Sequence, residues 1–81
     1  MIHELKTWKE YFVMVFCGSK EFELRKNDRD FKLTDELILK EWDNEKQEYT
    51  GRILHRRIKY ILYGGQFGLE EGYVILGLEK L

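Results

Sequence analysis

Three charged residues lie close together where an expected helix ends and a strand begins. Lys20, Glu23 and Arg25 follow Gly18 in the pattern G-x-K-x-x-E-x-R. In an extended strand Glu23 and Arg25 point to the same face. A carboxylate flanked by two cations can hold them in place for an anionic ligand, or accept a hydrogen bond from a base edge. The pattern predicts a site for a nucleotide-like ligand; the alternative is a solvated ion-pair cluster of little energetic weight.

A second charged feature is a basic segment that contains Arg52, His55, Arg56, Arg57 and Lys59. Arg52, Arg57 and Lys59 are candidates for a phosphate track, because cations bind the backbone phosphates of nucleic acids. The alternative is an exposed strand face that is balanced by the acidic residues between 41 and 48. The formal net charge of −1 argues against a protein that coats nucleic acids non-specifically, and leaves room for a local basic patch.

Metal, cofactor and disulfide chemistry have little support in this chain. His3 and His55 lie far apart, and with the single cysteine they form no metal-ligand spacing, so no metal and no cofactor are expected. Cys17 has no partner for a disulfide, which favours a reducing compartment. The N-terminal segment has no apolar signal core, and no apolar run approaches about 20 residues. We therefore expect a cytoplasmic protein that does not enter the membrane.

One helix is expected near the N-terminus, over about residues 8–17. Thr7 is the candidate N-cap and Glu10 has capping-box spacing. Gly18 can adopt the left-handed conformation that ends a helix. The helical stripe consists of Trp8, Tyr11, Phe12, Val15 and Phe16. Further apolar residues, Val13 and Met14, make a homo-oligomer through this helix one option.

The rest of the chain has the pattern of strands and turns. Phe22 and Leu24 alternate with charged residues, which is typical of a half-buried strand. Further strands are expected over about 36–42, 52–62 and 73–78, with a polar hairpin tip at 43–48. In the first of these Leu37 and Leu39 share a side. The residues expected to face inward in the second are Leu54, Ile58, Tyr60 and Leu62, and those expected to face outward are His55, Arg57 and Lys59.

These elements predict one α+β domain, mainly β, that spans residues 1–81. Several strands and one helix in so short a chain favour a small, partly closed β-barrel, because closure removes exposed sheet edges. The segment 73–78 is apolar on both faces, as a central strand would be.

The G-x-K-x-x-E-x-R pattern resembles the signature of ASCH domains, a branch of the PUA-like superfamily. The stretch Phe22–Phe31, with its F-E-x-R-K-N-D-R core, is more closely similar to a small uncharacterised family that is related to that branch and is often found in phage-derived regions. Residues 3–8, 41–43, 49–51 and 72–77 also fit the pattern of that family. The resemblance therefore covers nearly the whole chain.

This resemblance implies a PUA-like barrel with the helix across one end and a cleft that binds RNA or a modified nucleoside. Lys20, Glu23 and Arg25 would line the cleft. Further residues would approach it from the first strand and helix start, and from the turn after the charged strand; they are His3, Lys6, Trp8, Asn27 and Arg29. RNA or a nucleotide-like ligand is the expected partner.

Two other functions stay open. An amidohydrolase branch of ASCH proteins uses a threonine where this chain has Glu23, so hydrolysis of acylated nucleosides loses its central hydroxyl. Lys20 and Glu23 would then act as acid and base, and Glu70 or Glu71 could supply a carboxylate. The sequence therefore favours a binding protein over an enzyme, and the enzyme stays an open alternative. The third option is a protein-interaction module of a mobile element.

Overall fold

The computed structural model describes residues 1–81 and contains one five-stranded sheet and one helix. The elements, in chain order, are β1 (Ile2–Trp8), α1 (Lys9–Phe16), β2 (Phe22–Lys26), β3 (Glu36–Asp43), β4 (Glu48–Tyr63) and β5 (Tyr73–Lys80). The strand order is β1-β3-β4-β5-β2. β1 is parallel to β3, and the other pairs are antiparallel. The expected mainly β fold with one helix is confirmed.

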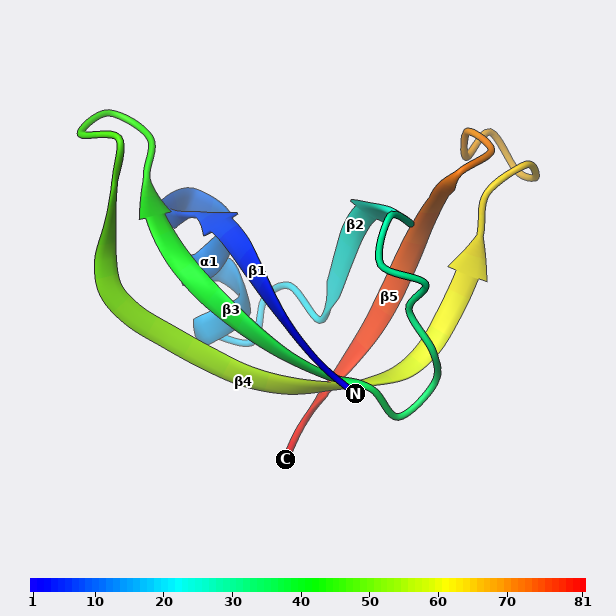
Figure 1. The fold of residues 1–81 in the computed structure, drawn as a ribbon, viewed down its shortest axis with the longest axis horizontal. Coiled ribbons are helices and arrows are strands. Elements are labelled where there is room, and N and C mark those ends of the chain that lie inside the picture. Colours follow the sequence, from blue (N-terminus) through cyan, green and yellow to red (C-terminus); the bar gives the residue numbers. More distant parts are fainter.

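The long strand β4 bends the sheet into a half-barrel. Its first half pairs with β3 and its second half with β5, and the register shifts once in each pairing. Such irregularities bend a strand and increase its twist. Figure 1 shows the result, an open curl in which β1 and β3 form one arm and β5 and β2 form the other. β1 and β2 are the two ends of the strand order, so the barrel is open between them. We call this opening the seam.

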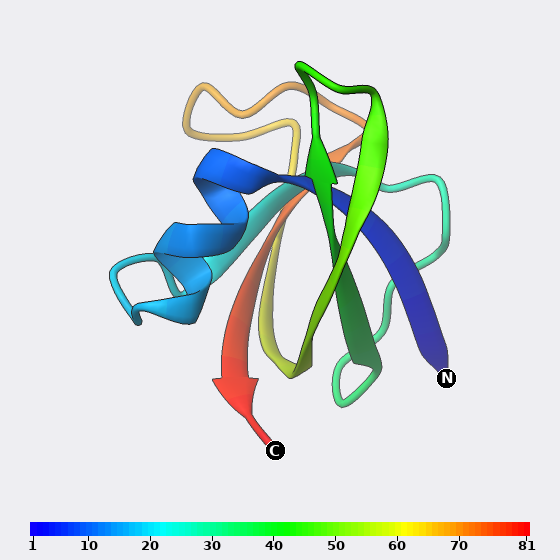
Figure 2. The same cartoon turned by 90° about the vertical axis from the view of Figure 1, so that its left-hand side faces the viewer.

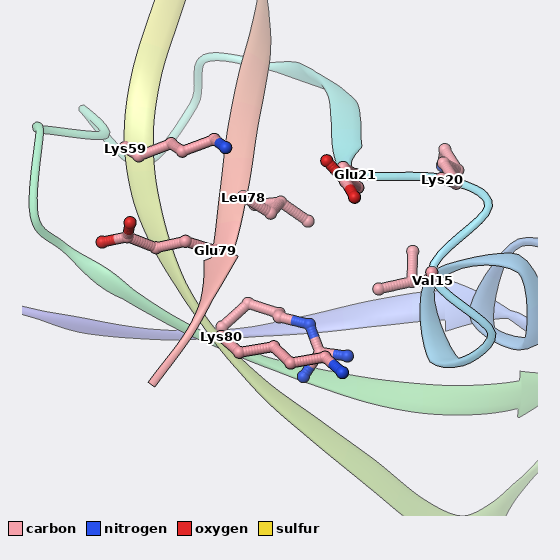
Figure 3. A pocket seen from close by; sticks show the side chains of 9 residues that line it. Val15, Lys20, Glu21, Lys59, Leu78, Glu79 and Lys80 are labelled. Atoms are coloured by element: carbon pink, nitrogen blue, oxygen red, sulfur yellow. The ribbon is translucent and has the colours of Figure 1, made fainter.

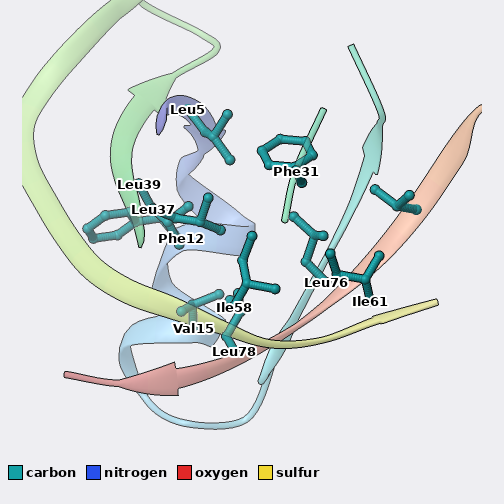
Figure 4. Close-up of a cluster of buried hydrophobic side chains, with 11 residues drawn as sticks. Leu5, Phe12, Val15, Phe31, Leu37, Leu39, Ile58, Ile61, Leu76 and Leu78 are labelled. Carbon is teal, nitrogen blue, oxygen red and sulfur yellow. The ribbon is translucent and has the colours of Figure 1, made fainter. Parts of the chain in front are cut away.

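The core fills the concave side of the curl (Figure 4). α1 contributes Phe12 and Val15, and the segment between β2 and β3 contributes Phe31. The remaining members come from the strands: Leu5, Leu37, Leu39, Ile58, Ile61, Val74, Leu76 and Leu78. Full burial of side chains of this size contributes about 1.5–3 kcal/mol each. Leu37 and Leu39 share one side of β3, as expected, and the structure shows that this side faces the core. β5 lies between β4 and β2, which agrees with the expected central strand.

The helix differs from the expectation at its N-terminus. Thr7 is wrong as an N-cap: it belongs to β1, and Trp8 occupies the cap position without a side-chain hydrogen bond. Because β1 runs directly into α1, the alternation of the strand turns Thr7 inward. Gly18 has a φ of +84° and ends the helix region as expected. Figure 2 shows α1 lying beside the sheet, where it packs on β3 and β1.

Two strands present faces other than those that alternation suggested. In β2 the apolar residues Phe22 and Leu24 lie outside, and Glu23 lies inside with only 3% exposure. In β4 the register shift between Ile58 and Tyr60 reverses the later positions. Tyr60 is therefore 60% exposed, whereas Ile61 is 8% exposed and joins the core. The inward prediction for Tyr60 was wrong because a bulge adds one residue that a strict period of two does not count.

Candidate ligand-binding site at the seam of the half-barrel

Lys20, Glu23 and Arg25 meet at the seam. Lys20 Nζ lies 3.2 Å from Glu23 Oε1, and Arg25 Nε donates to Glu23 Oε2 at 3.0 Å. Glu23 is buried, while both cations are partly exposed. A carboxylate removed from water needs such charge-assisted partners, because an unpaired buried charge is strongly destabilising. Glu23 therefore fixes the two cations at the edge of the half-barrel.

Arg25 also joins the two free edges of the sheet. Its Nη2 donates to the Lys6 carbonyl oxygen at 2.8 Å and to Thr7 Oγ1 at 3.1 Å. Both acceptors lie on β1, whereas Arg25 lies on β2, and these strands share no ladder of backbone hydrogen bonds. Nε and Nη2 are thus occupied by the protein, and the N–H groups of Nη1 have no protein acceptor. The guanidinium can bind a ligand while it holds the seam.

A hollow of about 340 Å³ opens beside this arginine. We call it the seam hollow; its lining consists of Lys6, Thr7, Trp8, Tyr11, Glu23, Leu24 and Arg25. A second hollow of about 410 Å³ is lined by Tyr11, Lys20, Phe22 and Leu24, and we call it the apolar hollow. The two share Tyr11 and Leu24, so they adjoin. Aromatic walls beside charged groups suit a planar, polar ligand such as a base.

The charge around these hollows is positive. Lys6, Lys20 and Arg25 contribute three positive charges, and Glu23 contributes one negative charge. Lys6 Nζ lies 4.0 Å from the centre of the Trp42 ring, and Lys20 Nζ lies 5.0 Å from that of Tyr11. Such cation–π contacts orient lysine side chains without neutralising them. The site therefore favours a ligand that carries negative charge or exposed carbonyl oxygens.

Three predicted site residues lie elsewhere. His3 is buried, its ring packs edge-on against Phe31 at 4.8 Å, and it is paired with Asp35. At about 3.3 Å per residue, His3 lies about 16 Å from Trp8 along β1. Asn27 Oδ1 accepts the Phe31 N–H, and Arg29 extends toward Asp28. None of the three lines either hollow, so the structure does not bring them together with Lys20, Glu23 and Arg25.

The three residues of the expected phosphate track do not form one line. Arg52 lies over the rings of Phe12 and Phe16, 5.2 Å from each centre, and 3.7 Å from Glu41. Arg57 Nη1 is 3.7 Å from Glu79. Arg52 and Lys59 are seven positions apart, which corresponds to about 23 Å of strand. These basic residues are close in sequence, but along the bent strand each lies in a different environment.

Sequence reasoning missed several residues of the site. Thr7 was assigned to a helix cap and Tyr11 to the helix core, and Phe22 and Leu24 to a buried face. Each of these residues lines one of the two hollows. The available signal was the position of the charged pattern: if Glu23 points inward, the apolar residues of the same strand must point outward. Glu70 and Glu71 line neither hollow.

Other structural features bear on the class of protein. No helix is long and apolar enough to cross a membrane. No three His, Cys, Asp or Glu side chains converge in a way that could hold a metal ion. The fold and the site together define a small, mostly β half-barrel domain with one short helix and a charged hollow at its open seam.

The chain belongs to a family described as a domain of unknown function (DUF3850), whose pattern matches residues 2–78. It is also 44% identical over 57 residues to a protein of Escherichia phage P2, an uncharacterised 12.9 kDa protein in the GpA 3′ region. That similarity covers 70% of this chain and 50% of the phage protein, so the chain spans about half the length of the curated relative it matches. The expected similarity to an uncharacterised, phage-associated family is confirmed.

Proposed function

We propose that this chain is an RNA- or nucleotide-binding module of the ASCH type, with a PUA-like fold, whose ligand occupies the seam hollow. The observation that carries the proposal is the buried Glu23 carboxylate, held between Lys20 and Arg25 beside a ligand-sized hollow. The G-x-K-x-x-E-x-R pattern at the same place adds the resemblance to ASCH domains.

The aromatic residues of the hollow supply a surface for a base. Trp8 is 48% exposed, and Tyr11 lines both hollows. Stacking of a base on an aromatic side chain is worth about 1–3 kcal/mol. In this proposal the base stacks on Trp8 or Tyr11, in the manner of single-stranded RNA recognition.

The cations supply the polar contacts. Arg25 presents its unoccupied Nη1 to a carbonyl or phosphate oxygen, and Lys6 adds a positive charge on the opposite strand. Glu23 acts as a positioning residue, because its two oxygens are already bound to Lys20 and Arg25. A guanidinium held in place by a carboxylate loses less freedom when it binds.

Substitution of Arg25 tests the proposal. Arg25→Ala should lower the affinity for a short labelled RNA or a nucleoside by about 1–3 kcal/mol, measured by fluorescence anisotropy or calorimetry at low salt. Arg29→Ala is the matched control, because it removes an exposed arginine that lies outside both hollows. It should leave the affinity unchanged.

Because Arg25 also joins β1 to β2, a second variant separates binding from folding. Trp8→Ala removes a half-exposed ring from the wall of the hollow and should weaken binding by about 1–3 kcal/mol. Circular dichroism checks that each variant is folded. Absence of binding by the unmodified protein to a broad panel of RNAs and nucleosides at low salt would refute the proposal.

A further inference from the structure

A third hollow lies where the connection between α1 and β2 meets the middle of β4 and the C-terminal end of β5. Its volume is about 190 Å³, and Val15 and Leu78 provide its apolar surface. Its charged lining consists of Lys20, Glu21, Arg56, Lys59, Glu79 and Lys80. We call it the basic hollow. Figure 3 shows Lys59 on β4, Lys80 on β5, and Lys20 and Glu21 on the connection between α1 and β2.

The positive charge of the basic hollow is not neutralised by the protein. Glu79 is already paired with Arg57, which lies outside the lining, and Lys20 is paired with Glu23. Arg56, Lys59 and Lys80 have no carboxylate at ion-pair distance, and Glu21 is the remaining acidic group. Three cations against one carboxylate leave a net charge of about +2 in a chain whose total is −1.

The sheet register places two of these cations against each other. Arg56 lies directly opposite Lys80 in the antiparallel pairing of β4 and β5. Like charges in this position are destabilising, and neither side chain has an ion-pair partner in the protein. The Arg56 guanidinium contacts only the carbonyl oxygen of His55, at 2.9 Å. A bound anion would offset the repulsion.

A bulge adds the third cation. Ile58 pairs with Leu78 and Tyr60 pairs with Gly77, so Lys59 has no partner on β5. Bulges commonly redirect a side chain, and they occur often beside functional sites. Here the extra residue is a lysine that lines the hollow together with its neighbours Arg56 and Lys80.

Lys20 connects this hollow with the candidate site. It lines both the basic hollow and the apolar hollow, and its Nζ contacts Glu23 at the seam. We propose that the basic hollow binds a backbone phosphate of a single-stranded nucleic acid whose base occupies the seam. This inference rests on the proposed function and narrows it, because the ligand becomes a strand of two or more nucleotides. A free nucleoside would leave the basic hollow empty.

Charge-removing substitutions test the inference. Lys59→Ala and Lys80→Ala should each weaken binding of a labelled, single-stranded eight-nucleotide RNA by about two- to fivefold, the range of an exposed ion pair. The slope of log affinity against log salt should become less steep by about 0.7 for each lost phosphate contact. Lys46→Ala is the matched control, because it removes an exposed lysine at the hairpin tip, at the opposite end of the molecule from the C-terminus (Figure 2). Binding of a single nucleoside should be the same in all variants.

The outcomes separate the two proposals. If Lys59→Ala and Lys80→Ala bind the RNA with the affinity and salt slope of the Lys46→Ala control, the phosphate site is refuted, while sensitivity to Arg25→Ala still supports the seam. If the lysine variants weaken binding and Arg25→Ala does not, the basic hollow is supported and the seam site fails. If the unmodified protein binds no RNA at low salt, both proposals fail.

Discussion

Two buried carboxylates of this half-barrel are held in different ways. Glu23 at the seam is bound by Lys20 and Arg25, two long side chains that remain partly exposed beside a hollow. Asp35, which precedes β3, is bound by His3 Nε2 at 2.8 Å, the Lys32 N–H at 3.1 Å and the Met1 amino group at 3.1 Å. The His3 ring is itself buried against Phe31.

The two clusters differ in the hydrogen-bond donors that remain free for a ligand. The Lys32 backbone N–H has no further hydrogen to offer, and the His3 ring is buried. The exposed Met1 amino group keeps spare hydrogens, but it lines none of the hollows. Arg25, in contrast, keeps Nη1 without a protein acceptor beside the seam hollow. A satisfied network rigidifies a fold, whereas a charged group with spare donors next to a hollow can also bind. The Asp35 cluster therefore supports the fold, and the Glu23 cluster is the candidate site.

The largest loss of stability should come from a substitution that disrupts the Asp35 cluster. Asp35→Ala leaves the buried His3 and the Lys32 N–H without their acceptor, and should lower the free energy of unfolding by about 3 kcal/mol. For a domain of this size each kcal/mol corresponds to about 4–8 °C in Tm. Urea and thermal unfolding measure the loss. RNA affinity of the folded fraction should not change; a parallel loss of affinity would show that the two clusters are not independent.

Acid should act on the same cluster. Burial raises the pKa of Asp35, but hydrogen bonds from His3, the Lys32 N–H and the Met1 amino group outweigh it and lower the pKa below its ordinary value. A lowered pKa contributes stability that is complete above the pKa of the unfolded chain, near pH 4, and is lost as the pH falls through the folded-state value. Unfolding free energies of the wild type should therefore drop below about pH 4 more steeply than those of Asp35→Asn. Equal slopes in this range would contradict the assignment.

A smaller loss of stability is expected from a substitution at the seam. Thr7→Val keeps the shape of a buried side chain and removes the hydroxyl oxygen that accepts from Arg25. We expect a loss of about 1 kcal/mol in the free energy of unfolding, the usual worth of one hydrogen bond. RNA affinity should also fall, because Arg25 loses one of the contacts that orient it. Thr7→Ser retains the acceptor oxygen, so it should bind RNA with the affinity of the wild type.

The local part of the candidate site was predictable from the sequence. Lys20, Glu23 and Arg25 lie within six positions, so a strand that starts at a helix end brings them together in almost any tertiary arrangement. The central position of β5 also followed from a run that is apolar on both faces. Local spacing was enough in both cases.

The long-range part was not predictable. The contacts of Arg25 with Lys6 and Thr7 join residues that are 19 and 18 positions apart, and His3 meets Asp35 across 32 positions. Alternation alone does not say which face of β2 is buried, because Glu23 can be inside only when its cations are in place. The bulge before Tyr60 depends on how β4 pairs with β5, so it cannot be predicted from the sequence of β4 alone.

The open seam has a practical consequence for finding the ligand. One arginine connects β1 to β2 where a closed barrel would have a row of backbone hydrogen bonds. Any molecule that binds only the folded seam raises the melting temperature, by an amount that grows with the ratio of its concentration to its Kd. A thermal-shift screen of nucleosides, nucleotides and short oligonucleotides can therefore report the ligand class before its identity is known, with Arg25→Ala as the reference protein.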